Sequence, residues 1–143
     1  MPGPRGRRDP RQEAAALLVI AMGGAIGAMA RYAIDVAADS AALAQPWATL
    51  AVNVVGCALM GALVSYVLAH PGRHRLWRPF LGVGVLGGFT TFSAFAADVV
   101  LLADAGAWVA NAMYVVATLA GGLFAVWIGY ATGHALSRSR PAT

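Results

Sequence analysis

An uncharged run from Pro79 to Ala97 constrains the fold more than any other part of the chain. Such a run has the length of a membrane span, since about 20 apolar residues cross the hydrocarbon. Its centre combines two glycines, three hydroxyl side chains and three phenylalanines in the order Gly87-Gly88-Phe89-Thr90-Thr91-Phe92-Ser93-Ala94-Phe95. Adjacent glycines favour a break in the helix, and broken backbone at membrane depth requires protein or a water-filled cavity beside it. We therefore interpret this segment as the wall of a permeation path.

The composition places the rest of the chain in a membrane as well. Hydrophobic residues make up 59% of the 143 residues, charged residues make up 11%, and the mean hydropathy is +0.68. These values lie outside the range of soluble domains. All ten basic residues are arginines, and they cluster at the chain ends and in one loop. This pattern is typical of positive charge that flanks membrane spans rather than of a nucleic-acid surface.

Four apolar segments have the length of a span, and we expect them at residues 14–34, 47–68, 80–102 and 108–133. Residues 1–13, rich in Pro, Gly and Arg, predict a disordered basic tail. A four-helix transmembrane domain over residues 14–136 and a C-terminal tail over residues 137–143 complete the predicted organisation. The predicted fold class is an all-α integral membrane protein with four transmembrane helices, of which the third is broken near Gly87–Thr91. The even number of spans predicts both termini on one side.

The first apolar segment has a second interpretation, a cleaved signal peptide. Arginines precede it, and Ala28-Met29-Ala30 resembles a cleavage site. Its length and its Gly23-Gly24 pair favour a span instead, because signal peptides have short apolar regions.

Polar side chains form stripes on two further spans. Helical spacing places Thr49, Asn53, Gly56 and Met60 on one face of the second span. It likewise places Asn111, Tyr114 and Thr118 on one face of the fourth span. Asn53 has two interpretations, an interhelical hydrogen bond or an amide N–H directed at an anion. Arg31, at the end of the first span, is either a side chain reaching the membrane surface or part of an electropositive vestibule.

Enzyme chemistry is not supported by the sequence, which shows no Ser-His-Asp set, no metal-ligand spacing and no pair of acids. Gly82, Gly84 and Gly87 match a dinucleotide-binding fingerprint, but no strand is predicted before them, and helix packing explains them better. We expect no Asp, Glu, Lys or His at mid-membrane depth, which argues against a proton-coupled transporter. The expected lining of amide, hydroxyl and aromatic ring-edge groups favours a small anion over a cation.

At these residues the chain resembles the Fluc (CrcB) family of fluoride ion channels. The resemblance covers most of the chain and is carried by four motifs, one in each span: Gly23-Gly24-x-x-Gly27-Ala28-x-x-Arg31-Tyr32, Thr49-x-x-x-Asn53-x-x-Gly56, the run from Gly87 to Phe95, and Asn111-x-x-Tyr114-x-x-x-Thr118. It implies an antiparallel dimer with two fluoride pores in the cell inner (plasma) membrane. Passive export of fluoride through such pores would give resistance to fluoride toxicity.

The resemblance also implies the roles of single residues. The fluoride pore would be lined by Asn53, Thr91, Phe92, Ser93, Phe95, Tyr114 and Thr118, with Arg31 in the vestibule. Ring edges of Phe92 and Phe95 would contact fluoride. Backbone carbonyls of Gly87 and Thr90 would hold a structural Na⁺ at the centre of the dimer. The chain departs from the usual family pattern at Ala94, where Thr is usual, and at Thr118, where Ser is usual.

Two other classes of protein remain as alternatives. A small multidrug-type four-helix exporter would need an intramembrane glutamate, whereas Glu13 precedes the first span. A non-conducting assembly protein would not require polar stripes on three spans.

The distribution of arginines predicts the orientation of the chain. Nine of the ten arginines lie on the side that holds both termini, and only Arg31 belongs near the other side. Because the positive charge of short loops stays in the cytoplasm, we predict cytoplasmic termini. An antiparallel homodimer needs both orientations, so this bias favours a heterodimer with an oppositely oriented paralogue. Reporter fusions at the C-terminus should give a mainly cytoplasmic signal. Comparable signals from both sides, or fluoride conduction by this chain purified alone, would instead support dual topology.

Overall fold

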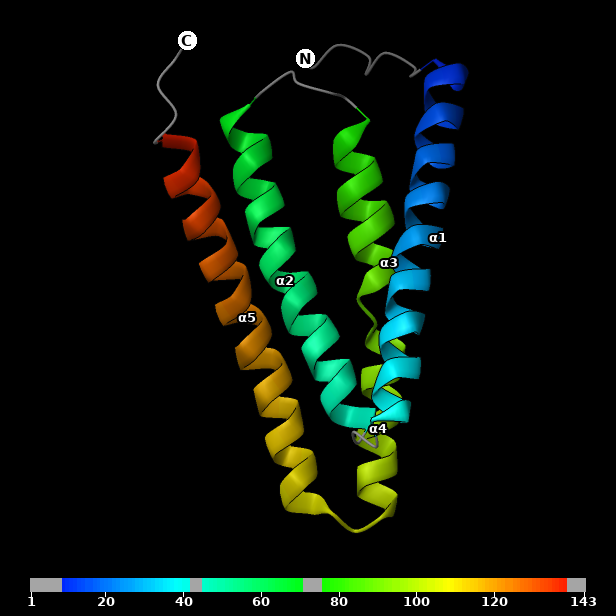
Figure 1. The fold of residues 1–143 in the computed structure, drawn as a ribbon, viewed down its shortest axis with the longest axis vertical. Coiled ribbons are helices and arrows are strands. Elements are labelled where there is room, and N and C mark those ends of the chain that lie inside the picture. Colours follow the sequence, from blue (N-terminus) through cyan, green and yellow to red (C-terminus); the bar gives the residue numbers. More distant parts are fainter. Residues whose placement is uncertain (1–8, 42–44, 71–75, 139–143) are drawn as a thin grey trace, which may run out of the picture.

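The computed structural model describes residues 9–41, 45–70 and 76–138, and every secondary-structure element in these ranges is a helix (Figure 1). The elements in chain order are α1 (Pro10–Ser40), α2 (Gln45–Ala69), the π-helical η1 (Pro79–Leu86), α3 (Gly87–Phe89), α4 (Phe92–Asp104) and α5 (Trp108–Arg138). Four segments are long and apolar enough to cross a membrane: Pro10–Ser40, Pro46–Ala69, Pro79–Asp104 and Trp108–Ser137. The third of them comprises η1, α3 and α4. The predicted all-α fold with four spans is confirmed.

The first helix is longer than the span expected at residues 14–34. It begins at Pro10, where the Asp9 carboxylate caps the helix by accepting a 3.0 Å hydrogen bond from the Arg11 backbone N–H. At the other end, the segment with Asp35 and Asp39, expected to be a link, is helical as far as Ser40. The Ser40 hydroxyl donates to the Val36 carbonyl at 2.8 Å and supports this last turn.

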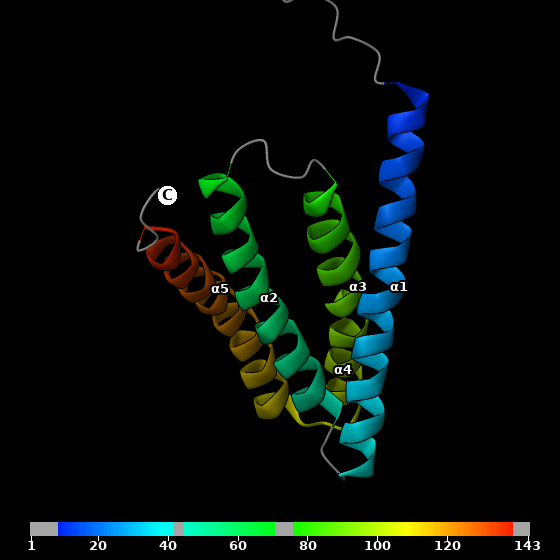
Figure 2. The ribbon, with the colours of Figure 1, turned by 45° about the horizontal axis from the view of Figure 1, so that its top comes forward.

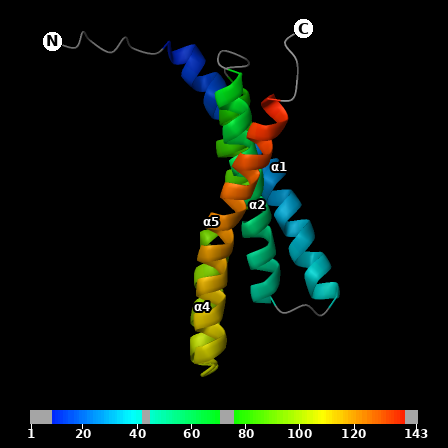
Figure 3. The same ribbon diagram turned by 90° about the vertical axis from the view of Figure 1, so that its left-hand side faces the viewer.

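The spans run alternately up and down, so the described ends of α1 and α5 lie at the same end of the bundle (Figure 1). The helices pack as two pairs, with α2 against α5 and α1 against η1 and α3. Figure 2 shows both pairs side by side, with α2 facing the third span. Seen from the side in Figure 3, the lower ends of α1 and α4 lie apart, with α2 between them. The third span therefore connects the two pairs of helices.

Glycines set the distance between α1 and the third span. A Cβ on Gly27 would overlap the Val85 carbonyl oxygen, and one on Gly84 would lie 3.0 Å from the Gly23 Cα. Gly88 likewise lies against the Gly24 carbonyl. The helix-packing interpretation is confirmed for Gly84, because no larger residue leaves room for such a backbone approach, but Gly82 and Gly87 make no comparable approach to another helix.

The break in the third span lies at two threonines rather than at the glycine pair. Gly87 has helical dihedrals of φ −66° and ψ −34°. Thr90 is extended at φ −77° and ψ 156°, and so is Thr91 at φ −145° and ψ 125°. Gly88 thus serves close packing on α1, Gly87 stays exposed, and the threonines carry the change of direction.

Replacing Gly27 by Ala should destabilise the protein, because the added Cβ collides with backbone atoms of η1 that cannot rotate away. We expect a loss of about 1–3 kcal/mol of unfolding free energy, the usual cost of overpacking. Thermal unfolding in detergent measures it. Gly24→Ala is the matched control, since a Cβ there meets nothing within 4 Å. An equal loss in both variants would contradict the packing argument.

Candidate permeation site

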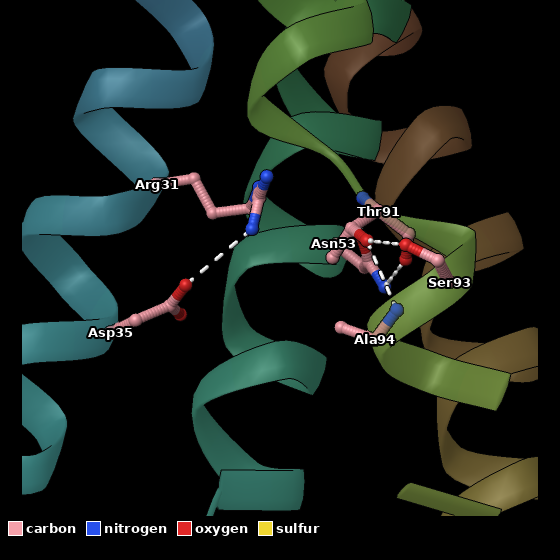
Figure 4. Close-up of polar contacts among 6 residues, drawn as sticks. All are labelled: Arg31, Asp35, Asn53, Thr91, Ser93 and Ala94. Atoms are coloured by element: carbon pink, nitrogen blue, oxygen red, sulfur yellow. Dashed lines mark hydrogen bonds and ion pairs between the residues drawn. The ribbon is translucent and has the colours of Figure 1, made fainter. Parts of the chain in front are cut away.

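The extended residues of the third span are held by one side chain of α2. The Asn53 Nδ2 group donates to the Thr91 carbonyl at 2.9 Å, and the Thr91 backbone N–H donates to Asn53 Oδ1 at 2.9 Å (Figure 4). One amide therefore satisfies both backbone groups of a residue that has left the helix. These two bonds correspond to the first of the two interpretations of Asn53, an interhelical hydrogen bond. The second Nδ2 hydrogen remains for another acceptor, because a primary amide carries two N–H donors.

Threonine and serine hydroxyls shape the two helix ends at the break. Thr90 Oγ1 donates to the Leu86 carbonyl at 2.9 Å and closes the last turn before the break. Thr91 Oγ1 accepts from the Ala94 backbone N–H at 3.1 Å and so caps α4. The same oxygen lies 3.2 Å from Ser93 Oγ. Ala94 contributes its backbone N–H to this cap, so its missing hydroxyl does not weaken the start of α4.

Two backbone carbonyls lose their helical partners as a consequence. In a continuous helix the Thr91 N–H would donate to the Gly87 carbonyl, and the Ala94 N–H would donate to the Thr90 carbonyl. Here Asn53 engages the first N–H and the Thr91 hydroxyl engages the second. The oxygens of Gly87 and Thr90 are the two that the resemblance assigns to Na⁺. Carbonyl oxygens freed in this way are chemically suited to a small, hard cation.

Aromatic rings continue from the break to the fourth span. The ring centroids of Phe92 and Phe95 are 5.8 Å apart at an interplanar angle of 48°. Phe95 and Tyr114 follow at 5.5 Å and 36°. The Phe92 side chain is 80% exposed, whereas Tyr114 on α5 is only 2% exposed. The three predicted pore aromatics thus form a continuous series that runs from an open face of the chain into the bundle.

Asp98 is a buried carboxylate that the sequence reasoning missed. It lies on α4 within the third span, is 6% exposed, and its Oδ2 accepts a 2.9 Å hydrogen bond from the Tyr114 hydroxyl. The expectation concerned mid-membrane depth, whereas Asp98 is a buried acid near the end of the span expected at residues 80–102. A carboxylate three residues after Phe95, inside an expected span, was itself a functional signal. Thr49, also buried, and Thr118 lie beside the same Tyr114 hydroxyl.

Several expected donors are already engaged within the chain. The Tyr114 hydroxyl proton goes to Asp98, and the Asn111 Nδ2 group donates to the Val99 carbonyl at 3.0 Å. The buried Thr118 Oγ1, by contrast, has no hydrogen-bond partner among the residues that the structure describes. Thr91 and Ser93 can share only one proton between their oxygens, which leaves another for an acceptor outside the pair. Among the expected pore residues in the described chain, the groups still free to donate are the Thr118 hydroxyl, one proton of the Thr91–Ser93 pair, the second Asn53 N–H and the ring edges.

Arg31 points from α1 toward the elements that carry Asn53 and Thr91 (Figure 4). Its Nη1 atom lies 3.5 Å from Asp35 Oδ2, and its buried Nε has no partner within the described ranges. The Asp35 carboxylate compensates part of the charge that a vestibule would use. The structure thus gives Arg31 an ion pair along its own helix rather than simple exposure at the membrane surface.

Fold and site together define a small, multi-pass membrane protein with a polar break in one span and aromatic rings beside it. The chain belongs to the family described as CrcB-like protein, Camphor Resistance (CrcB), whose model matches residues 18–130. It is 43% identical over 118 residues to "Fluoride-specific ion channel FluC 1" of Streptomyces coelicolor, covering 82% of this chain and 77% of that protein.

Two further relatives match nearly their whole length. "Fluoride-specific ion channel FluC 2" of Nocardia farcinica is 41% identical over 133 residues, which cover 90% of this chain and 95% of the relative. "Fluoride-specific ion channel FluC" of Agrobacterium fabrum is 44% identical over 121 residues, which cover 84% and 97%. The resemblance seen in the four motifs is confirmed at the level of the family.

Replacing Asn53 by Asp should make the stability of the protein depend on pH. An ionised carboxylate cannot donate to the Thr91 carbonyl, and it places negative charge beside that oxygen, whereas the protonated acid can donate. The stabilising contact should therefore be present at low pH, where the acid is protonated, and be lost at alkaline pH, where it is ionised. We expect a loss of about 1–3 kcal/mol at alkaline pH. Unfolding of variant and wild type across one pH series tests this; a pH-independent difference would contradict it.

Proposed function

We propose that this protein is a fluoride-selective channel that gives passive fluoride export across the plasma membrane. Family membership and the names of the relatives support fluoride as the ion. Hydrogen fluoride is a weak acid that crosses membranes in its neutral form and dissociates inside, which traps the anion. A passive path then lets fluoride leave down its gradient without an energy source.

The observation that carries the proposal is the polar break on an uncovered face of the third span. Gly87 is exposed, its carbonyl has lost its helical donor, and Ser93 and the Phe92 ring are exposed beside it. Irregular polar backbone does not face lipid in membranes and is tolerated only against protein or water. This face therefore needs a cover. We infer an antiparallel dimer, formed with a second copy or with an oppositely oriented paralogue, that encloses the break.

Within such a dimer the residues act by replacing the hydration shell of the anion. Donors fixed in place offset the free-energy cost of dehydrating the anion, because no protein groups have to reorganise around the ion. The hydroxyls of Ser93 and Thr118 and the second N–H of Asn53 are the polar donors. Ring edges of Phe92 and Phe95, which carry partial positive charge, serve as further contacts. Asp98 holds the Tyr114 hydroxyl and so orients the ring that borders Phe95.

Na⁺ fits this site as a structural ion rather than as a driving ion. The carbonyls of Gly87 and Thr90 would hold it. When bound, Na⁺ supplies positive charge that compensates carbonyl dipoles freed by the break. The amide of Asn53 keeps these carbonyls free by engaging the Thr91 N–H.

Family membership now distinguishes the proposed fluoride channel from a small multidrug-type exporter. The sequence argument against the exporter relied on the absence of an intramembrane glutamate, and it is weakened because buried Asp98 places an acid within the third span. The match of residues 18–130 to the CrcB family takes its place.

Fluoride efflux from liposomes tests the function. The protein should be purified through a tag from its own cells, so that any oppositely oriented partner copurifies, and reconstituted with equal Na⁺ on both sides. Fluoride efflux without a sodium gradient, together with little chloride efflux, is expected. No fluoride efflux from correctly assembled protein would refute the proposal, and efflux that appears only with a sodium gradient would indicate a transporter. The same assay on the chain expressed alone distinguishes a homodimer from a heterodimer.

Phe92→Ile and Phe95→Ile should each reduce fluoride efflux by about ten-fold or more, which corresponds to about 1.4 kcal/mol of lost stabilisation of the ion in transit. Isoleucine keeps the bulk of the side chain but has no positive ring edge. Phe124→Ile is the matched control, since that ring is 61% exposed on α5 and stacks on Trp127, away from the break. Wild-type efflux in both test variants would remove the rings from the mechanism.

A further inference from the structure

A groove runs between α2 and η1 at the end of the bundle that holds the described ends of α1 and α5. The two helices diverge toward that end (Figure 1), and two adjoining cavities of about 320 and 260 Å³ lie between them. Leu63, Val67 and Arg78 line both cavities. Val83 lines the deeper cavity, is 63% exposed, and precedes the exposed Gly87 by one turn. The groove therefore opens on the same face as the polar break, and a subunit that covers the break covers the groove as well.

The other half of the third span presents a narrow exposed face on α4. Ser93, Ala97, Val100, Leu101 and Asp104 are all exposed, and their spacing places them on one side of the helix. The two small residues lie next to the break, the two larger apolar residues follow, and the carboxylate ends the stripe. This order of side chains complements a groove with apolar walls and an arginine at its mouth.

The two ends of the third span carry charges that are unfavourable within the chain itself. Arg78 directly precedes η1, and Asp104 is the last residue of α4. A cation at a helix N-terminus and an anion at a helix C-terminus both oppose the helix dipole. Both side chains are exposed, and neither forms an ion pair with a residue that the structure describes. An opposite charge from another subunit would compensate each of them.

The break lies midway between these two charges. Arg78 lies twelve residues before Thr90, and Asp104 lies thirteen residues after Thr91. At about 1.5 Å per residue, each charge is about 20 Å from the break. A two-fold axis through the break, as in the antiparallel dimer proposed above, exchanges the two halves of the span. Arg78 of one protomer then lies at the depth of Asp104 in the other, and Val83 lies at the depth of Ala97.

We propose that α4 of a second copy of this chain occupies the groove. Its Ala97 and Val100 pack beside Val83, and its Asp104 pairs with Arg78 at the mouth. The two-fold axis forms this contact twice, so each end of the dimer holds one ion pair. The inference rests on the antiparallel dimer of the proposed function and adds the contact surface and the partner. It favours a second copy over the paralogue that the arginine distribution favours, because this chain carries both halves of the contact.

Charge reversal in two differently tagged copies of the full chain tests the ion pair. Arg78→Glu and Asp104→Arg each place like charges opposite one another in their own dimers, whereas a mixed dimer of the two variants contains only opposite pairs. Coexpression should raise the ratio of mixed to like dimers about five-fold above the statistical value of about one, the effect that two exposed ion pairs supply. Purification through both tags in turn, with quantification of each chain, measures this ratio.

Arg11→Glu coexpressed with Asp104→Arg is the matched control. Arg11 is exposed at the same end of the bundle, but it lies on α1 and lines neither cavity of the groove. The ratio of mixed to like dimers should therefore stay near about one. Both coexpressions change the charge of the two ends equally, so an effect of charge on membrane orientation acts alike in both. A single chain with Arg78→Glu and Asp104→Arg together should dimerise like the wild type, which shows that the substitutions permit folding.

Cysteine crosslinking locates the contact without changing any charge. In a chain with Cys57→Ala, the pair Val83→Cys and Ala97→Cys should give disulfide-linked dimers on oxidation, because a disulfide forms only where two Cα atoms lie within about 7 Å. The control pair is Val83→Cys with Ala33→Cys. Ala33 is exposed on α1, six residues beyond the Gly27 that packs against the third span beside the break. Several-fold less crosslinking is expected from this control.

Equal ratios of mixed to like dimers in the two coexpressions, or equal crosslinking from Ala33 and Ala97, would overturn the proposal. A chain that stays monomeric alone and assembles only with a different protein from its own cells would overturn it as well. None of these measurements uses fluoride. Enriched mixed dimers without fluoride efflux would therefore refute the channel and keep this interface, whereas fluoride efflux without enriched mixed dimers would refute the interface alone.

Discussion

The two-point pairing of the Asn53 amide with the backbone of Thr91 is the interaction on which the rest of the structure depends. A helix that breaks inside a membrane exposes donors and acceptors that water cannot reach, and each costs several kcal/mol if it stays unpaired. Asn53 satisfies both groups of the residue at the break, with two 2.9 Å hydrogen bonds from another helix. The break is therefore a fixed feature of the fold and not a local distortion.

The same pairing determines which carbonyl and hydroxyl groups at the break are free to contact ions. By engaging the Thr91 N–H, Asn53 deprives the Gly87 carbonyl of its helical donor, and the Thr91 hydroxyl does the same for Thr90 by capping α4. Acceptors are freed on one side and hydroxyl donors are presented on the other. The carbonyls proposed to hold Na⁺ and the hydroxyls and ring edges proposed to contact fluoride are therefore all arranged by one altered turn. Both chemistries then share a single structural cause.

Close backbone packing makes this arrangement rigid. Gly27 against Val85 and Gly88 against Gly24 leave no room for side chains, so α1 fixes the position of the third span. On the other side, Gly56 leaves room for the Thr90 side chain, which a Cβ would overlap. Buried Asp98 adds a fourth constraint through its hydrogen bond to Tyr114 on α5. Each of the other three spans thus contacts the third at or near the break.

The sequence by itself determined the membrane class, the four spans, the family and the region of the break, because hydropathy and motif spacing are local properties of the chain. Only the tertiary structure decided that Thr90 and Thr91, rather than the glycines, leave the helix, since that depends on which glycine faces α1 and on where the Asn53 amide reaches. The partners of Tyr114 and Asn111 were equally beyond the sequence, because a stripe of polar residues gives a face but not what lies opposite. Asp98 shows the same limit. Its place in the chain marked it as an acid within a span, but only packing against α5 buries it and gives its carboxylate a donor.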